Sequence, residues 1–271
     1  MKRDRIATSF TALLAAVSLA MAGSSTAGEL AVFAAGSLRG PLTEIAQVFE
    51  AGHAGQSVVL TFGASGLLKD RIAGGEHADV FASANMEHPQ ALATAGKAVP
   101  VTRFARNALC ALAAPDVAVT SDSLVERMLD PAVKLGTSTP KADPSGDYAW
   151  VMFERVEETG KPGAFKVLAE KARQLTGGPN SPPPPTGRNV YGALVSGGQA
   201  DIFITYCTNA KVASTEVPSL QVVEVPAKIN VNADYGVTRT VDAAPLAADF
   251  VNFLLGREGQ SILARHGFSP A

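Results

Sequence analysis

The segment of residues 31–52, AVFAAGSLRGPLTEIAQVFEAG, most limits the folds that are open to this chain. It begins within an apolar run of strand length, residues 30–35, which Gly36 and Ser37 interrupt. Beyond the turn, apolar residues recur at the three- and four-residue spacing of one helix face, at Leu42, Ile45, Ala46 and Phe49. The segment therefore predicts a strand, a tight turn and a helix, the unit that α/β folds repeat.

The turn at Gly36 and Ser37 predicts an anion site. Backbone N–H groups at a helix start have no partner within the helix and lie at the positive end of its dipole. The Ser37 hydroxyl adds one more donor, and such an arrangement receives anions. The competing interpretation is that Ser37 only caps the helix, as serine often does.

Two later passages repeat this pattern. Residues 56–62 form a β-branched run that is followed by GASG, with Ser65 at the start of a helix. Residues 133–136 predict a strand, and Pro144, Ser145 and Gly146 then lead into another helical pattern. Turns after parallel strands gather at one sheet edge, where ligands bind, so the repeated turns favour an anion site over separate helix caps.

The rest of the chain continues the alternation of strands and helices. We expect further strands over residues 79–82, 105–115, 202–206, 221–225 and 235–240, and helices over residues 86–95, 124–129, 165–175 and 189–196. Residues 176–187 are rich in proline and glycine and predict a surface loop. Because these units exceed one compact sheet, we expect an α/β fold with two lobes and the site between them.

The N-terminus predicts a secretory signal peptide. Lys2, Arg3 and Arg5 precede an apolar stretch with small residues, and cleavage before Gly23 or Gly28 fits the pattern. An uncleaved anchor is the alternative, but the stretch is short for a membrane span. We therefore expect residues 1–27 to be removed and the mature chain to have no membrane insertion. The net charge of −2 gives no electrostatic case for binding nucleic acid.

Export bears on the two cysteines of the chain, Cys110 and Cys207. Both lie in apolar runs that are typical of strands, and the exported compartment permits disulfides. We expect them to form a bridge, although two buried thiols are also compatible with the sequence.

Seven segments together resemble the periplasmic molybdate-binding proteins of ABC transporters, which are type II periplasmic solute-binding proteins. They are VFAAGSL, FGASGLL, ADVFASAN, DPSGDYA, NVYGAL, GQADIFITYCTNA and ILARHGF, and the resemblance spans residues 30–268. It implies an α/β fold with two lobes, each a mostly parallel sheet flanked by helices. On this basis, residues 28–108 and about 236–271 would form the first lobe, and about 109–235 the second.

The resemblance also implies which residues contact the anion. Ser37 and Ser65 match the two serines of the first lobe, and Ser145 and Val190 match residues that donate backbone N–H groups. Tyr206 matches a tyrosine whose hydroxyl reaches the anion, while core packing is its alternative role.

The expected function is the capture of molybdate or tungstate in the periplasm and its delivery to a membrane permease with its ATPase. Neutral donors can hold a dianion without a paired cation, so we expect no cofactor and no resident metal. We also expect a monomer without catalytic activity. Phosphate, sulfate or a small organic anion is the alternative ligand. An exported serine hydrolase is a further alternative, but GASG around Ser65 is not the GxSxG elbow.

Asp147 departs from the family pattern, which has an apolar residue there. A carboxylate facing the anion would repel a dianion and would suit a ligand that still carries a proton, such as phosphate. Because acids are common in the first turn of a helix, we expect Asp147 to point away from the site.

Overall fold

The computed structural model describes residues 28–183 and 185–271, so the predicted signal peptide lies outside the described residues. The strands are β1 (Gly28–Ala35), β2 (Gln56–Gly63), β3 (Val80–Ser83), β4 (Thr102–Ala113), β5 (Leu135–Ser138), β6 (Arg173–Thr176), β7 (Ile202–Tyr206), β8 (Gln221–Glu224) and β9 (Asn232–Arg239). The helices are η1 (Gly36–Leu38), α1 (Arg39–Gly52), α2 (Ser65–Ala73), α3 (Glu87–Thr94), α4 (Leu124–Leu129), α5 (Pro144–Glu158), α6 (Ala164–Lys171), α7 (Val190–Ser196), α8 (Cys207–Glu216), α9 (Leu246–Leu255) and α10 (Arg257–Arg265).

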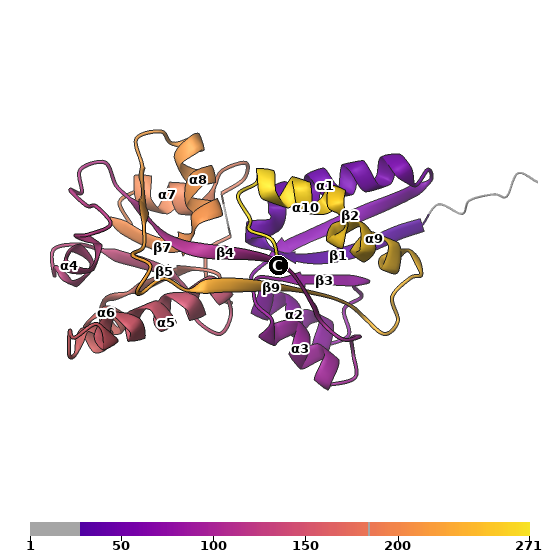
Figure 1. Ribbon diagram of the computed structural model, residues 1–271, viewed down its shortest axis with the longest axis horizontal. Coiled ribbons are helices and arrows are strands. Elements are labelled where there is room, and N and C mark those ends of the chain that lie inside the picture. The colour runs from indigo at the N-terminus through magenta and orange to yellow at the C-terminus, as the bar shows by residue number, and fades with distance from the viewer. Residues whose placement is uncertain (1–27, 184) are drawn as a thin grey trace, which may run out of the picture.

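These elements form two lobes that two long strands connect (Figure 1). In the first lobe, β1 pairs in parallel with β2 and β3, and helices α1, α9 and α10 lie on the opposite side of the sheet from α2 and α3. In the second lobe, β5 pairs in parallel with β6 and β7, between α5 and α6 on one side and α7 and α8 on the other. The antiparallel strands β4 and β9 cross between the lobes, so the strand order is β2-β1-β3-β9-β4-β7-β5-β6. The predicted α/β fold with two lobes is confirmed.

The first strand and helix follow directly from their residue pattern. Leu30 and Val32 of β1 are fully buried, and the apolar stripe of α1 buries Leu42, Ile45 and Phe49 against the sheet. Burying each such side chain contributes about 1.5–3 kcal/mol, so the stripe holds the helix on the sheet.

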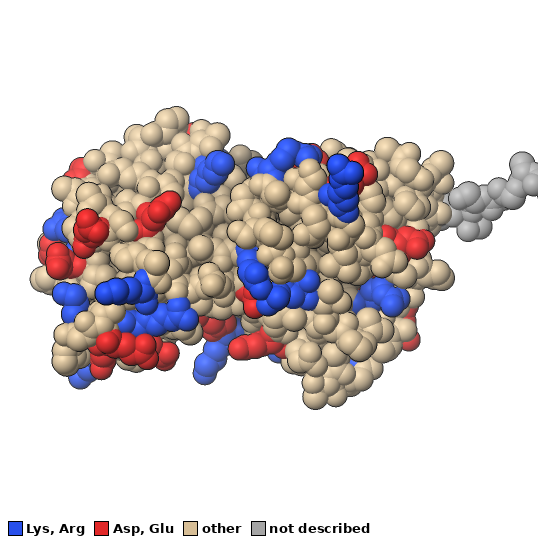
Figure 2. Space-filling model, in the orientation of Figure 1, with Lys and Arg blue, Asp and Glu red and all other residues tan. Residues whose placement is uncertain are grey.

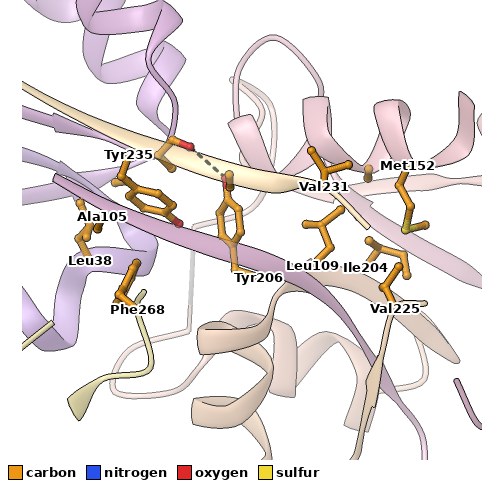
Figure 3. Close-up of a cluster of buried hydrophobic side chains, with 14 of the residues drawn as sticks. Leu38, Ala105, Leu109, Met152, Ile204, Tyr206, Val225, Val231, Tyr235 and Phe268 are labelled. Atoms are coloured by element: carbon orange, nitrogen blue, oxygen red, sulfur yellow. Dashed lines mark hydrogen bonds between the residues drawn. The ribbon is translucent and has the colours of Figure 1, made fainter. Parts of the chain in front are cut away.

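One hydrophobic core continues through the crossing strands (Figure 3). Tyr235 of β9 and Tyr206 of β7 lie side by side at its centre, with ring centroids 5.6 Å apart. Leu38 lies at the first-lobe end of this cluster, and Met152 lies at the second-lobe end. The two lobes therefore share buried side chains at the crossing.

The predicted lobe boundaries fall inside the crossing strands. The boundary between residues 108 and 109 lies within β4, and that between residues 235 and 236 lies within β9. The boundaries themselves stay a prediction.

Two expected elements differ from the structure. The helix expected over residues 165–175 ends at Lys171, and Arg173–Thr176 form strand β6, because these residues pair with β5. Helix α8 directly follows the predicted strand of residues 202–206, and the sequence did not predict it. Cys207 is thus the first residue of a helix, although the run in which it lies is typical of strands.

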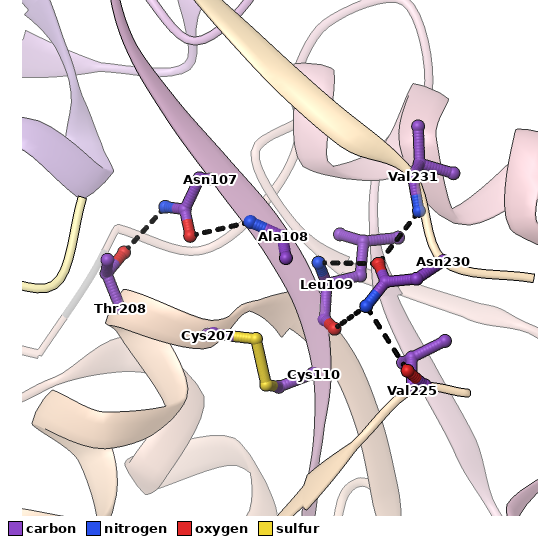
Figure 4. The surroundings of a disulfide bond; sticks show 9 residues. All are labelled: Asn107, Ala108, Leu109, Cys110, Cys207, Thr208, Val225, Asn230 and Val231. Atoms are coloured by element: carbon purple, nitrogen blue, oxygen red, sulfur yellow. Dashed lines mark hydrogen bonds between the residues drawn. A yellow bond between two sulfur atoms is a disulfide. The ribbon is translucent and has the colours of Figure 1, made fainter. Parts of the chain in front are cut away.

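The disulfide between Cys110 and Cys207 is present, which confirms the expected bridge (Figure 4). It joins β4 to the start of α8, with the two Cα atoms 4.7 Å apart. A second link lies beside it, where the Asn107 amide donates to the Thr208 hydroxyl over 2.9 Å. The first turn of α8 is therefore fixed to a crossing strand.

The described residues contain no helix long and apolar enough to span a bilayer. On the face shown in Figure 2, basic and acidic side chains lie interspersed. That face therefore presents no extended field of one sign.

Candidate functional site

A cavity of about 240 Å³ lies between the lobes, where several parallel strands end. From the first lobe it is lined by the residues after β1 and β2, including Ser37 and Ser65. From the second lobe it is lined by Tyr206 at the end of β7, Val190 at the start of α7 and the residues after β6. The carboxyl ends of parallel strands are the edge at which α/β folds bind ligands.

Four of the five predicted ligand-binding residues line this one cavity, namely Ser37, Ser65, Val190 and Tyr206. Ser145 is fully buried and does not line it. The structure thus brings together residues from segments that are up to 169 positions apart in the sequence, from position 37 to position 206.

Ser37 does not cap the helix that follows it. It lies in η1, and the N-cap of α1 is Leu38, with no side-chain cap hydrogen bond. The Ser37 hydroxyl instead pairs with the Tyr235 hydroxyl at 2.9 Å. The capping interpretation is therefore wrong for Ser37, whose side chain is oriented by crossing strand β9.

Ser65 is the first residue of α2 and likewise does not cap it. Its hydroxyl oxygen accepts the Ala84 N–H at 3.1 Å, which leaves its own O–H free to turn toward the cavity. Next to it, the Gly66 N–H donates to the Ala142 carbonyl of the second lobe over 2.8 Å. The two lobes are therefore in direct contact beside the cavity.

Tyr206 is buried and also lines the cavity, while its role as a donor to an anion stays a prediction. Its ring is buried in the shared core, and its hydroxyl donates to the Ala84 carbonyl of the first lobe over 3.4 Å (Figure 3). Burial raises the pKa of Tyr206 well above its ordinary value, so the hydroxyl remains a donor at neutral pH.

Val190 begins α7, where backbone N–H groups have no partner within the helix. The preceding Asn189 caps the helix by accepting the Gly192 N–H at 3.0 Å. The Val190 N–H remains at the helix start beside the cavity, at the positive end of the helix dipole.

The Ser145 N–H has a different partner from the one expected. It donates to the Asp143 carboxylate over 3.1 Å, so Asp143, and not a serine, caps α5. The Ser145 hydroxyl is buried and has no hydrogen-bond partner among the described residues. The role of Ser145 as a donor to an anion stays a prediction.

Sequence reasoning missed Asp143, which lines the cavity. Its pKa is raised to about 6, mainly by burial and in small part by the nearby Asp147, while the Ser145 N–H and the Ser138 hydroxyl act in the opposite direction. The Asp-Pro pair at residues 143–144 is typical of a helix start and could have indicated the cap, but it carries no signal of a place in the cavity.

Asp147, the acid that the sequence had singled out, does not line the cavity. Its carboxylate accepts the Lys141 N–H at 2.6 Å, and burial raises its pKa. A cationic residue, Arg39, does line the cavity and was also missed; its guanidinium lies 4.5 Å above the Phe62 ring.

Among the described residues that line the cavity there is no histidine. The Ser37 hydroxyl pairs with the Tyr235 hydroxyl, and the Ser65 hydroxyl oxygen accepts the Ala84 N–H. Among the described residues, no group of three His, Cys, Asp or Glu side chains could hold a metal ion.

Comparison with known proteins identifies similar proteins over nearly the whole chain. The family model for bacterial extracellular solute-binding proteins matches residues 30–269. An uncharacterized protein of Pasteurella multocida is 36% identical over 241 residues, which cover 89% of this chain and 98% of that protein. The molybdate-binding protein ModA of Mycobacterium tuberculosis is 28% identical over 253 residues, which cover 90% of this chain and 85% of ModA.

The fold is also that of a solved binding protein. The sulfate-binding protein SubI of Mycobacterium tuberculosis superposes with a TM-score of 0.74 at 18% identity, covering 90% of this chain and 87% of SubI. At this identity the likeness shows the fold alone. The family model supplies the assignment: this chain belongs to the bacterial extracellular solute-binding proteins.

Proposed function

We propose that this protein binds an oxyanion in the cavity between its lobes, with molybdate or tungstate as the preferred ligand. It would then deliver the anion to a membrane permease that is driven by its own ATPase. Membership of the solute-binding family supports a binding protein over an enzyme. The family description also supports export, and the periplasm is the compartment that we propose.

The convergence of uncharged donors from both lobes on one cavity carries this proposal. The hydroxyls of Ser37, Ser65 and Tyr206 and the helix start at Val190 all line it. A buried dianion must have its acceptor positions filled, and hydroxyls and helix N-termini fill them without a salt bridge.

Closure of the lobes would complete the site. Gly66 and Ala142 already form a hydrogen bond across it, as do Tyr206 and Ala84. We propose that the lobes open to admit the anion and close on it about β4 and β9, because donors from both sides must reach the same ligand.

The choice of molybdate over other oxyanions rests on sequence similarity. ModA of Mycobacterium tuberculosis is similar to this chain over most of both proteins, whereas the likeness to SubI is one of fold. Tetrahedral oxyanions present the same acceptors, so selection among them would depend on the size of the closed cavity and on its charged residues. Sulfate and phosphate are therefore the alternative ligands.

Thermal unfolding of the mature protein with separate oxyanions tests the proposal. A ligand present at a thousand times its Kd stabilises the folded state by about 4 kcal/mol. For a chain of this size we expect a rise in Tm of about 8–16 °C with molybdate and tungstate. A shift with phosphate or sulfate alone would reject the ligand choice, and no shift with any oxyanion would reject the function.

The double variant Ser37→Ala and Ser65→Ala is the matched control for that measurement. It keeps the fold of both turns, since neither serine caps its helix. It should lose most of the shift that molybdate produces while retaining a cooperative transition.

A further inference from the structure

Asp143 is the one acidic residue among the described residues that line the cavity, and Arg39 is the one basic residue among them. A carboxylate is a hydrogen-bond acceptor when ionised and a donor when protonated. An oxyanion without protons offers acceptors only. The ionised form of Asp143 therefore repels such a ligand, whereas the protonated form can bind it.

The position of Asp143 is fixed by its neighbours. One of its oxygens, Oδ1, accepts the Ser145 N–H at 3.1 Å and so caps α5. Gly177 lies against the other side, where an added Cβ would come within 2.5 Å of Oδ2. Gly177 itself has a φ of +78°, so both its backbone conformation and the lack of space disfavour a side chain there. The carboxyl group therefore has little freedom to turn away from a bound anion.

The groups around Asp143 do not neutralise it. Asp147 of the same helix adds a second negative charge. Burial, and to a lesser extent the charge of Asp143, raises the pKa of Tyr191 of α7 and of Tyr206 of β7, so both tyrosines stay protonated. The Ser138 hydroxyl from β5 approaches the carboxylate, but no cation contributes to the Asp143 pKa. Arg39 lines the same cavity, and its guanidinium lies over the Phe62 ring.

Two unprotonated anions side by side in a site of low dielectric destabilise each other strongly, so that one of them takes a proton. Here the carboxyl is prepared for this, because burial has already raised its pKa to about 6. A bound dianion would raise that pKa further.

We propose that Asp143 holds the oxyanion through one shared proton. A fully deprotonated oxyanion is bound together with one proton that Asp143 takes from solvent, and its O–H then donates to the ligand. A hydrogen-bearing oxyanion such as hydrogen phosphate brings this proton itself and donates it to the ionised carboxylate. This inference rests on the proposed function of the cavity and names the residue that discriminates ligands by protonation.

Calorimetric titration of the mature protein with molybdate and with phosphate separates the two cases. In buffers of different ionisation enthalpy at pH 8, molybdate should bind with uptake of about one proton and phosphate with almost none. With an Asp143 pKa of about 6, its protonated fraction falls roughly 75-fold between pH 6.5 and 8.5, and the Kd for molybdate should rise by a similar factor.

The variant Asp143→Asn tests the residue itself. Asparagine caps helices as well as aspartate does, so α5 should keep its start. The variant should lose proton uptake and the pH dependence, and it should bind molybdate up to about 100-fold more tightly than the wild type at pH 8. It should bind phosphate more weakly, because the amide has a single, uncharged acceptor oxygen and the Ser145 N–H takes it.

Asp147→Asn is the matched control, since Asp147 lies on the same helix and does not line the cavity. It should retain proton uptake on binding molybdate. If wild-type protein binds molybdate with no proton uptake and a constant Kd from pH 6.5 to 8.5, the inference is wrong and the proposed function stands. If no oxyanion binds at any pH, both are wrong.

Discussion

Replacing Tyr206 by Phe isolates the hydroxyl that the second lobe contributes to the cavity. The ring is 2% exposed and packs between Tyr235 and Tyr148, contacts that phenylalanine keeps. The hydroxyl has one weak partner in the described residues, the Ala84 carbonyl at 3.4 Å. The variant therefore leaves the packing of the core intact and removes a single donor.

The expected effects on folding and on binding differ in size. A hydrogen bond this long lies at the weak end of the range of about 0.5–1.5 kcal/mol, so the free energy of unfolding without ligand should fall by less than about 1 kcal/mol. A hydrogen bond to a charged ligand contributes about 1.5–3 kcal/mol, so the Kd for molybdate should rise roughly 13- to 160-fold. Urea unfolding measures the first quantity, and calorimetry measures the second.

Tyr235→Phe is the matched control for this measurement. Tyr235 is equally buried, and its hydroxyl pairs with Ser37 at 2.9 Å without lining the cavity. It should lose more stability than the Tyr206 variant and less affinity, because it keeps every donor that lines the cavity and removes only the partner that orients Ser37. If Tyr206→Phe binds molybdate as tightly as wild type does, the hydroxyl does not contact the anion and the assignment of Tyr206 to the site fails.

Three further predictions concern the disulfide, the contact between the lobes and the buried acid. Replacing Cys110 and Cys207 by Ser removes a disulfide that closes a loop of 97 residues. In the chain-entropy model this should lower the free energy of unfolding by about 4–5 kcal/mol. Equal urea midpoints for variant and wild type would contradict this. In Gly66→Ala, the new Cβ would lie 2.5–2.7 Å from carbonyl oxygens of residues 141–142, so the lobes should separate. The radius of gyration measured by small-angle scattering should therefore rise. An unchanged radius with unchanged affinity counts against closure. Folding raises the pKa of Asp143 from 3.8 to about 6, so between these pH values the native state binds more protons than the unfolded state. The free energy of unfolding should therefore fall by at most about 3 kcal/mol from pH 4 to pH 6.5 and stay at the lower value above pH 6.5. Asp143→Asn should remove this decline, and chemical unfolding at several pH values would reveal a variant that still shows it.

The repeated strand, turn and helix could be predicted because local pattern and tertiary structure agree there. The apolar stripe of α1 and the Gly/Ser turns are visible in the residues themselves, and the structure has the strand, the turn and the helix at the expected places. Strand Ile202–Tyr206 also has the predicted bounds, because a short apolar run between polar residues suits a buried strand.

The errors arise where pairing or packing decides the conformation. Residues 173–176 continue a helical pattern in the sequence and become a strand because β5 offers an edge to pair with. Helix α8, CTNAKVASTE, is made of small and polar residues with no clear apolar stripe, so periodicity could not reveal it. Its burial depends on the disulfide and on contacts with β4, which no local window contains.

The site shows the same division. The serines at the turns could be placed from their position after strands, whereas the resemblance was needed for Val190 and Tyr206. Asp143 escaped notice because its place in the cavity depends on how α5 packs. At Gly146, an added Cβ would lie 2.6 Å from the Ser138 carbonyl, so the start of α5 lies close against the end of β5.

The crossing of β4 and β9 has a mechanical consequence for the whole molecule. A row of hydrogen bonds joins β4 and β9, so the two strands resist sliding past each other. Bending of the pair out of its plane leaves these hydrogen bonds in place. Tyr206 precedes the helix that the disulfide fastens to β4, and Ser37 is bonded to Tyr235 of β9. If the lobes close as proposed, bending of β4 and β9 would therefore move Ser37 and Tyr206 together, because both are linked to these two strands.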